Sequence, residues 1–399
     1  MITTTSSPLG TAFDGTGFDG TGFDASAFDG MAEAIAADTV VAGLGESTRF
    51  AHETFAVRDQ IFRRLVRSHD FRILAVQDDA AVGQALDAYV TGGAGTAASA
   101  LVSAWRPWRT VETAAALDWI RGFNHDHPGD PVRIVGIKPT QAGPADYEAL
   151  LEHVRQVAPN RLAELASHLG PIRTAHQVDE HVQRARGIHP GRPFAEHAHD
   201  ALAIVEQLPG GDASDHVGEL VRRIADFHER SVAGSGSYAG DARTWAERII
   251  RHQRRTGRRV AYWDGIAHSS AAPTALGPAP DRDARPTVGS VLRHHYGTRY
   301  VSVAIGFHHG DLGVAEIPEP APDWLDARLG AAGDPARWLD LRSDELRASW
   351  TGPARVRVIS GVYTPARDYL EHLAVGSLPE AFDLLVQVRN ASPVHWLAV

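Results

Sequence analysis

The stretch from residue 40 to residue 67 constrains the fold more than any other part of the chain. Residues 40–45 are apolar and rich in valine and glycine, and a helical pattern follows over residues 50–67. An apolar run that stops at glycine predicts a buried strand and a tight turn, because Gly45 has no Cβ to strain the backbone. Ser47 and Thr48 are suited to cap the helix. The turn and the start of the helix carry the ionisable side chains Glu46, Arg49, His52 and Glu53.

The same strand-and-helix pattern recurs along the chain. Further buried strands are predicted at residues 71–76, 132–137, 259–263 and 300–307, with strand-like runs at 356–360 and 384–388. Helices are predicted at residues 81–90, 111–124, 242–256 and 288–295. Strands that alternate with helices at this spacing are typical of a parallel sheet joined by right-handed crossovers. The predicted fold class is therefore α/β, a mostly parallel β-sheet flanked by helices.

Two segments depart from this alternation. Residues 1–30 contain repeats of the phrase Phe-Asp-Gly-Thr-Gly and are predicted to be a low-complexity, disordered tail, because they lack a burial pattern. The folded domain is expected to span residues 31–399 and to open with a short helix from Met31 to Ala37. Within it, residues 144–230 show helical periodicity only, which predicts a helical insertion or cap that covers the carboxyl edge of the sheet.

Composition excludes several functional classes. The net charge of -10 at pH 7 argues against a nucleic-acid or anionic-membrane partner. The chain contains no cysteine, which excludes disulfides, thiol nucleophiles and cysteine-ligated metals. It has no apolar run long enough to cross a bilayer and no signal segment at its start. We therefore expect a cytoplasmic protein that acts on a small molecule, and the sequence identifies no partner protein.

Polar side chains follow four of the predicted strands at the point where each strand ends. In chain order they are Glu46, then Gln77 with Asp78 and Asp79, then Asp264 with His268, then His308 with His309 and Asp311. The carboxyl ends of parallel strands share one edge of a sheet, and ligands bind at that edge. Carboxylates beside histidines suit general acid–base catalysis, because an imidazole takes a proton near neutral pH and a carboxylate orients it.

Other kinds of site find little support. The chain has no Gly-x-Ser-x-Gly elbow, no phosphate-binding Walker loop, no Rossmann glycine fingerprint and no His-Glu-x-x-His zinc motif. A metal site remains an alternative, because oxygen and nitrogen ligands are present at Glu46, Glu53, Asp78, His268, His308 and His309. No ligand pair has a diagnostic spacing, so neither a metal nor another cofactor is assigned.

Four motifs in a fixed order resemble the erythromycin esterase family, whose relatives include proteins of succinoglycan biosynthesis. They are Gly-Glu-Ser-Thr at residues 45–48 with Glu-Thr-Phe at 53–55, Trp-Arg-Thr-Val-Glu at 108–112 with Leu-Asp-Trp at 117–119, Gly-Ser-Val-Leu-Arg at 289–293 with Tyr300 and Ile-Gly-Phe at 305–307, and Leu-Pro-Glu-Ala-Phe-Asp at 378–383. The resemblance runs from about residue 40 to the C-terminus and is weakest in the helical insertion. It implies ester or lactone hydrolysis.

The chain departs from this family at three expected site positions. The family's water-activating histidine falls at Arg49, its glutamate at the end of the second strand falls at Gln77, and the first histidine of its Trp-Ala-His-Asn-x-His motif falls at Gly265. Only Glu46, Glu53 and His268 carry over. An arginine stays protonated near neutral pH and cannot serve as an ordinary general base.

Three interpretations follow. In the first, the chain hydrolyses an ester, a lactone or a related natural-product intermediate, with His52 as the replacement base beside the catalytic Glu46, Glu53 and His268. In the second, Arg49 binds a carboxylate, phosphate or enolate during a cyclisation, elimination or isomerisation. In the third, the chain binds a ligand without catalysis. We take the first as the main hypothesis, with the following residues predicted to bind substrate: Arg49, Gln77, Asp78, Asp264, His308 and His309.

Overall fold

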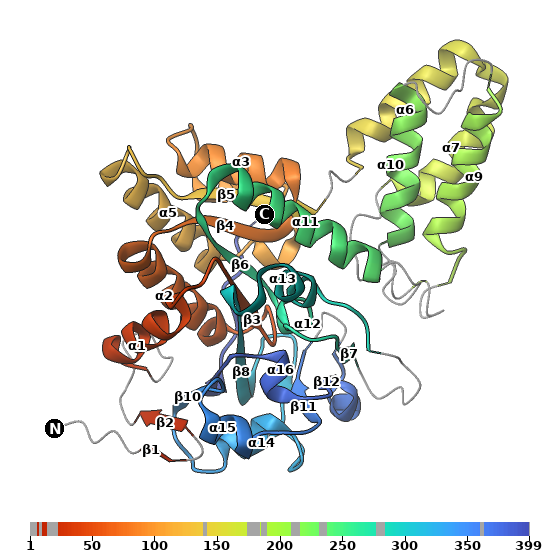
Figure 1. Ribbon diagram of the computed structural model, residues 1–399. Coiled ribbons are helices and arrows are strands. Elements are labelled where there is room, and N and C mark those ends of the chain that lie inside the picture. The colour runs from red at the N-terminus through yellow and green to blue at the C-terminus, as the bar shows by residue number, and fades with distance from the viewer. Residues whose placement is uncertain are drawn as a thin grey trace. The chain divides into compact units, whose positions relative to one another are not determined.

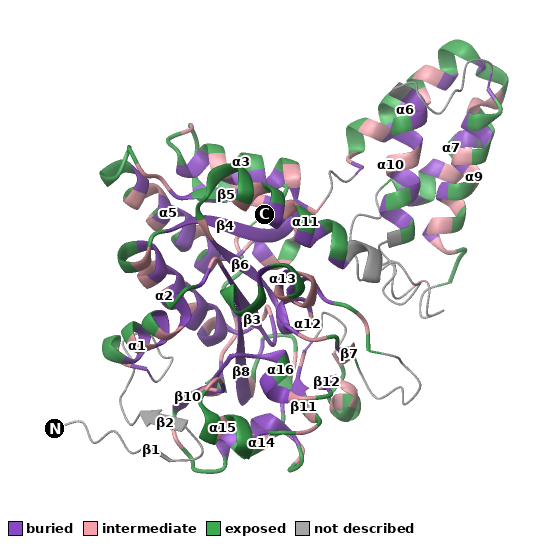
Figure 2. Ribbon diagram, in the orientation of Figure 1, coloured by how far each residue is buried: buried purple, intermediate pink, exposed green. Residues whose placement is uncertain are grey.

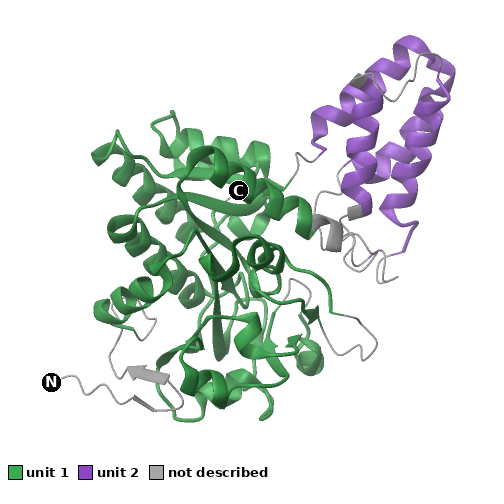
Figure 3. Ribbon diagram, viewed as in Figure 1, with its two compact units in different colours: residues 1–138, 242–399 green, residues 139–241 purple. Residues whose placement is uncertain are grey.

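The computed structural model describes residues 6–7, 10–13, 23–138, 142–173, 184, 190–208, 216–230, 238–276, 284–359 and 363–398. The chain divides into two compact units, which are coloured separately in Figure 3. The larger unit comprises residues 1–138 and 242–399, and the smaller unit comprises residues 139–241. No helix in the described ranges combines the length and apolar character that crossing a membrane requires.

The larger unit contains a ten-stranded sheet whose order is β1-β2-β10-β13-β8-β3-β6-β4-β5, with β9 paired to β8. Figure 1 labels the central strands β8, β3, β6 and β4 of this sheet. Strands β13, β8, β3, β6, β4 and β5 pair in parallel, as predicted. The antiparallel strands β2 and β10 extend the edge beyond β13. The strand bounds are β1 Ser6–Ser7, β2 Gly10–Phe13, β3 Val41–Glu46, β4 Phe71–Asp79, β5 Arg133–Lys138, β6 Arg259–Gly265, β8 Tyr300–Asp311, β9 Glu316–Ile317, β10 Ala336–Asp340 and β13 Leu384–Ala391.

Both faces of this sheet are buried, because successive side chains of a strand point to opposite faces. In β3, Val41 belongs to the apolar cluster on one face, and Ala42 and Leu44 belong to the cluster on the other. Helices α1 Ala25–Ala36, α2 His52–His69, α3 Ala80–Val90 and α5 Val111–Asp126 pack on the second face. Helices α11 Tyr238–Thr256 and α13 Val288–Tyr296 supply apolar residues to the first. The purple interior in Figure 2 follows these layers.

Smaller elements complete this unit. A separate antiparallel sheet has the order β11-β12-β7. Of the run predicted at 356–360, Val356 and Arg357 belong to this sheet rather than to the main one, and residue 360 lies outside the described residues. The bounds are β7 Ala275–Leu276, β11 Ala354–Arg357, β12 His372–Val375, α4 Ala97–Ala100, α12 Ile266–Ser269, α14 Leu325–Gly330, α15 Asp344–Ser349 and α16 Leu378–Ala381. Short 3₁₀ helices span η1 Arg106–Trp108, η3 Gly297–Arg299 and η4 Pro365–Leu370.

The smaller unit is helical in the part that the structure describes. Its helices are α6 Pro144–Val157, α7 Leu162–Ile172, α9 Phe194–Glu206 and α10 His216–Arg230, with η2 at Pro159–Arg161. They share an apolar core of their own. Within it, Tyr147 and His228 are buried and their side chains are hydrogen-bonded at 2.7 Å. That this unit covers the carboxyl edge of the sheet stays a prediction.

The predicted boundary of the N-terminal tail is wrong in the part that the structure describes. Helix α1 begins at Ala25 rather than Met31, and the side chain of Asp24 caps it by accepting from the Ala27 amide at 2.8 Å. Phe23 and Phe28 are buried, with ring centroids 5.6 Å apart. These phenylalanines look like part of the repeat in the sequence, yet they fall on the apolar face of the helix. The predicted tail residues 1–5, 8–9 and 14–22 lie outside the described residues.

The docking of α1 generates a stability prediction. Phe28→Ala should lower the free energy of unfolding by about 3–5 kcal/mol, because it removes a buried aromatic side chain. Urea unfolding followed by tryptophan fluorescence measures the change. Glu33→Ala, at an exposed position of the same helix, serves as the control and should change stability by less than about 0.5 kcal/mol. Equal stability of the two variants would contradict the packing of α1 against the larger unit.

Candidate functional site

Four central strands bring their carboxyl ends together. Glu46 at the end of β3 is in register with Gly265 of β6 on one side and with Ile305 of β8 on the other. On the far side of β6, Val76 of β4 is in register with Trp263. The strand ends that carry Glu46, Gln77 and Asp264 are therefore neighbours. Gly45 lies within β3 rather than in a turn, and a Cβ there would come within 2.9 Å of Ile266 Cα, so α12 requires a glycine at this position.

A buried ion pair joins Glu46 to helix α2. Arg58 Nη1 lies 2.7 Å from Glu46 Oε2, and both side chains are buried. The Arg58 guanidinium packs over the rings of Trp263 at 4.6 Å, Phe55 at 5.1 Å and Trp108 at 5.2 Å. Burial raises the pKa of Glu46, and the positive charges of Arg58 and Arg49 oppose that rise. The sequence analysis missed Arg58, although an arginine between Phe55 and Phe62 on the apolar face of the helix was a usable signal.

Arg49 is the centre of a polar network at the strand ends. Its Nη2 donates to Asp264 Oδ1 at 2.7 Å and also to Gln77 Oε1. Its Nε lies 3.5 Å from Glu46 Oε1, and its guanidinium packs 4.5 Å from the centre of the Trp105 ring. The Arg49 side chain is 19% exposed, whereas Asp264 and Glu46 are buried, so Arg49 is the one of these three side chains that reaches solvent. Among the described residues, no side chain or carbonyl accepts a hydrogen bond from its Nη1.

The guanidinium of Arg49 occupies the space beside Gly265. A Cβ built on Gly265 would lie 3.7 Å from Arg49 Nη2 and 3.8 Å from Arg49 Nη1. A methyl group would fit there, but a longer side chain at position 265 would meet the guanidinium. The arginine at position 49 and the glycine at position 265, noted separately as departures from the family pattern, are thus spatially coupled.

Gln77 connects Arg49 to His268. A guanidinium only donates hydrogen bonds, so the Gln77 amide must turn its oxygen toward Arg49 and its Nε2 toward His268. Gln77 Nε2 lies 3.4 Å from His268 Nε2, which must then accept, and His268 is neutral in this arrangement. Burial lowers the pKa of His268, and the charges of Arg49 and Lys138 lower it further. The glutamine at position 77 is therefore linked to the arginine at position 49 as well.

Two other predicted carboxylates hold backbone in place. Asp264 accepts from the Tyr262 hydroxyl and from the Gly265 amide at 2.7 Å. Asp78 accepts from the amide of Trp105 at 2.8 Å, which positions the ring that packs on Arg49, and burial raises the pKa of Asp78. Lys138 Nζ lies 4.9 Å from the centre of the same Trp105 ring.

We expected His52 and Glu53 to lie in one pocket with Glu46. Their hydrogen bonds are made with other residues. His52 Nδ1 lies 2.9 Å from Glu112 Oε1. The Glu53 carboxylate accepts from the amide and the hydroxyl of Ser392, each at 2.6 Å. Helix α2 begins at His52, so Arg49 precedes the helix and does not share a helical face with these two residues. That they share one pocket with Glu46, Arg49 and His268 stays a prediction.

His308 and His309 form a separate cluster near the end of β8. Their Nδ1 atoms are 2.8 Å apart, and Glu319 lies close enough to complete a possible metal-ligand set. Burial and the neighbouring His309 lower the pKa of His308 to about 4.

The predicted metal ligands Glu46, Glu53, Asp78 and His268 do not join either of the two ligand sets found among the described residues. The second set is His52, Glu112 and His395.

A family model matches most of the chain. The family model for erythromycin esterase matches residues 66–391. The chain belongs to the erythromycin esterase family. The resemblance inferred from the motifs is thereby confirmed.

Solved structures share the fold at low sequence identity. A protein from Bacillus cereus has 18% identity and a TM-score of 0.62, with 94% of this chain and 100% of that chain covered. A succinoglycan biosynthesis protein has 17% identity and a TM-score of 0.59, with 91% of each chain covered. A mutant of the erythromycin esterase EreC in its open conformation has 16% identity and a TM-score of 0.60, with 98% of each chain covered. A search of curated proteins finds no match.

The Arg58–Glu46 pair generates a second stability prediction. Glu46→Gln should lower the free energy of unfolding by about 3–5 kcal/mol, because it leaves the buried charge of Arg58 without its partner. Asp323→Asn makes the same chemical change in an exposed pair with Arg355 and should cost less than about 1 kcal/mol. Urea unfolding of both variants measures the difference. A cost for Glu46→Gln as small as that of the control would show that the pair contributes little to stability.

Proposed function

We propose that this member of the erythromycin esterase family hydrolyses an ester, a lactone or a related natural-product intermediate. The observation that carries the proposal is the arrangement of Arg49 beside His268, with an Arg49 Nη1 donor that no described residue uses and a histidine whose pKa is lowered. A macrolide lactone is the first substrate to test, because one structural neighbour is an erythromycin esterase. The expectations of natural-product metabolism and of a cytoplasmic location belong to this proposal.

In the proposed reaction, His268 acts as the general base. Its neutral imidazole takes a proton from water at Nε2, the water oxygen attacks the carbonyl carbon, and the carbonyl oxygen becomes negative. The 3.4 Å separation from Gln77 Nε2 is long for a hydrogen bond, so a water molecule competes well for the same lone pair. When the carbon–oxygen bond breaks, the His268 imidazolium returns the proton to the leaving alkoxide.

Arg49 supplies the positive charge in this mechanism. Its Nη1 donates to the oxygen that becomes negative, which stabilises the transition state more than the neutral ester. Asp264 and Gln77 hold the guanidinium through Nη2, and Glu46 lies beside Nε. Glu46 and Asp264 therefore position Arg49. His52, Glu53, Asp78, His308 and His309 have no direct chemical step in this mechanism.

The alternative is a non-hydrolytic reaction, and one observation favours it. The position at which the family has its water-activating histidine holds a donor that cannot accept a proton. A guanidinium is well suited to bind a carboxylate, a phosphate or an enolate, so a cyclisation, elimination or isomerisation of an anionic intermediate fits the same arrangement. Incubation with aryl esters and a macrolide separates the two. Absence of turnover by well-folded protein would favour this alternative or a non-catalytic ligand-binding role.

Substitution of Arg49 tests its role directly. Arg49→Lys should lower kcat/KM by roughly tenfold to a hundredfold, because a lysine cannot bridge Asp264 and Gln77 and still donate to substrate; a charge-assisted contact is worth about 1.5–3 kcal/mol. Arg49→His should lose as much. Arg63→Lys, in another arginine that packs on a tryptophan and pairs with an aspartate, is the matched control and should retain activity. Higher esterase activity in Arg49→His would show that the arginine is a bystander.

The protonation state of His268 predicts a pH dependence. Only the neutral imidazole accepts a proton, so kcat/KM should fall as the pH drops through the pKa of His268. Burial lowers that pKa from its ordinary value of 6.5, so the midpoint of the acid limb should lie below 6.5. Ester hydrolysis measured across pH with the folded wild-type protein gives this midpoint. Wild-type activity in His268→Gln would contradict the role of His268 as base.

A further inference from the structure

The C-terminal segment binds the N-terminal ends of two helices. Residues 392–397, here called the C-terminal strap, form bridges that pair Pro393 with Ala51 before α2 and Trp396 with Thr110 before α5. The amide of Val111 donates to the carbonyl of His395 at 2.7 Å, and this bond fixes the strap beside Glu112. The strap lies outside the residues matched by the family model.

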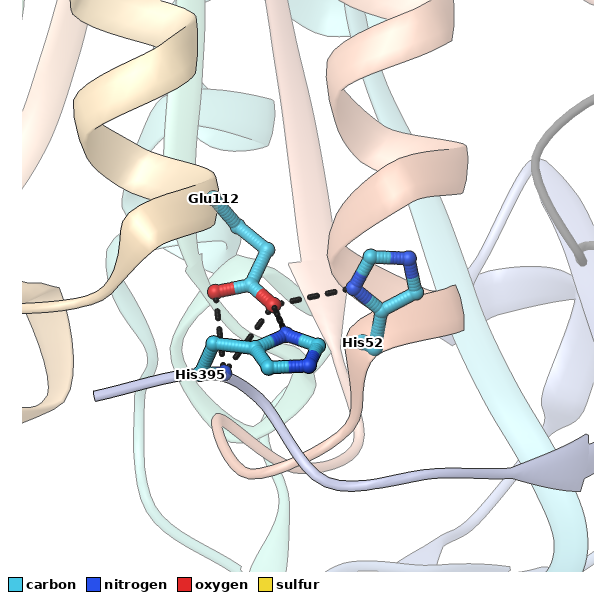
Figure 4. Close-up of side chains that lie close together, drawn as sticks. All are labelled: His52, Glu112 and His395. Carbon is cyan, nitrogen blue, oxygen red and sulfur yellow. Dashed lines mark hydrogen bonds and ion pairs between the residues drawn. The ribbon is translucent and has the colours of Figure 1, made fainter.

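Three potential metal ligands converge where the strap crosses the helices. His52 Nδ1 and His395 Nδ1 lie 2.9 Å and 2.8 Å from the same oxygen, Glu112 Oε1 (Figure 4). One ligand atom from each residue lies within 4.8 Å of the others. The three residues come from the start of α2, the start of α5 and the strap, so no short sequence motif indicates that they form a set of ligands.

The donor atoms suit a divalent cation. The Glu112 carboxylate offers an oxygen ligand, and each imidazole offers a nitrogen, which binds a metal when it carries no proton.

We propose that His52, Glu112 and His395 form a binding site for a divalent transition-metal ion, best matched by Zn²⁺, which fastens the C-terminal strap to α2 and α5. Two imidazoles and a carboxylate are a donor set that Zn²⁺ favours, and tetrahedral coordination leaves a fourth position for water. The side chains of His52 and His395 are 33% and 71% exposed, which gives an ion and its water access. The site is separate from the proposed hydrolytic network and does not depend on it.

Calorimetric titration of the chelator-treated full chain with ZnCl₂ tests the site. The wild type should bind Zn²⁺, and His395→Ala should weaken binding by at least about tenfold, since loss of a ligand should cost no less than loss of a supporting contact. His395 is largely exposed, so its removal should leave the fold intact. His125→Ala, which removes an exposed histidine from α5, is the control and should bind like the wild type.

Two further measurements separate this site from others. Co²⁺ should give a visible absorption band that is lost in His395→Ala and in Glu112→Gln, and Zn²⁺ should raise the Tm of the wild type but not of His395→Ala. Unchanged Zn²⁺ affinity in His395→Ala would overturn the proposal, as would absence of Zn²⁺ binding by the wild type. Binding that is lost in His308→Ala and retained in His395→Ala would overturn it too, and would assign the ion to the cluster with Glu319.

Discussion

The buried ion pair between Arg58 and Glu46 determines how the rest of the sheet edge is arranged. A carboxylate at the end of the central strand is costly to bury unless a cation compensates it, and helix α2 provides that cation from between three aromatic rings. Arg49 then adds a second positive charge and Asp264 a second negative one, so the two guanidiniums and two carboxylates balance. With this balance, a charged network can persist in an apolar interior and still present one guanidinium to solvent.

Arg49, Gln77 and Gly265 lie together at the strand ends and depend on one another. A guanidinium at position 49 needs an acceptor at position 77 and open space at position 265. Gln77 Oε1 provides the acceptor, and the glycine at position 265 leaves the space. The orientation that Arg49 imposes on the Gln77 amide in turn keeps a lone pair on His268 Nε2. Arg49 thus influences the hydrogen bonding of His268 through the Gln77 amide. The network combines a fixed cation with a neutral imidazole, which is a combination suited to a reaction that develops negative charge on oxygen.

The glutamates near the N-terminal ends of α2 and α5 act differently from Glu46. Glu53 and Glu112 both accept hydrogen bonds from backbone amides of the C-terminal segment, so helix ends that already favour negative charge become its points of attachment. His52 is hydrogen-bonded to Glu112, so it belongs with these attachment points rather than with Glu46. Attachment of the strap and the chemistry proposed at Arg49 therefore use separate sets of residues, even though Arg49, His52 and Glu53 lie close together in the sequence.

The sequence by itself determined the alternation of strands and helices, the family and the set of polar strand ends, because each depends on local periodicity or on short motifs. Glu46, Gln77 and Asp264 could be placed at one edge because parallel strands share their direction. Only the tertiary structure decided the partners. The Glu53 carboxylate accepts a hydrogen bond from a residue 339 positions away in the sequence, and His52 is hydrogen-bonded to a residue 60 positions away. Contacts between residues so far apart produce no local sequence pattern. The role of Arg58 could not be predicted from helix α2 alone either, because its partner Glu46 lies at the end of strand β3.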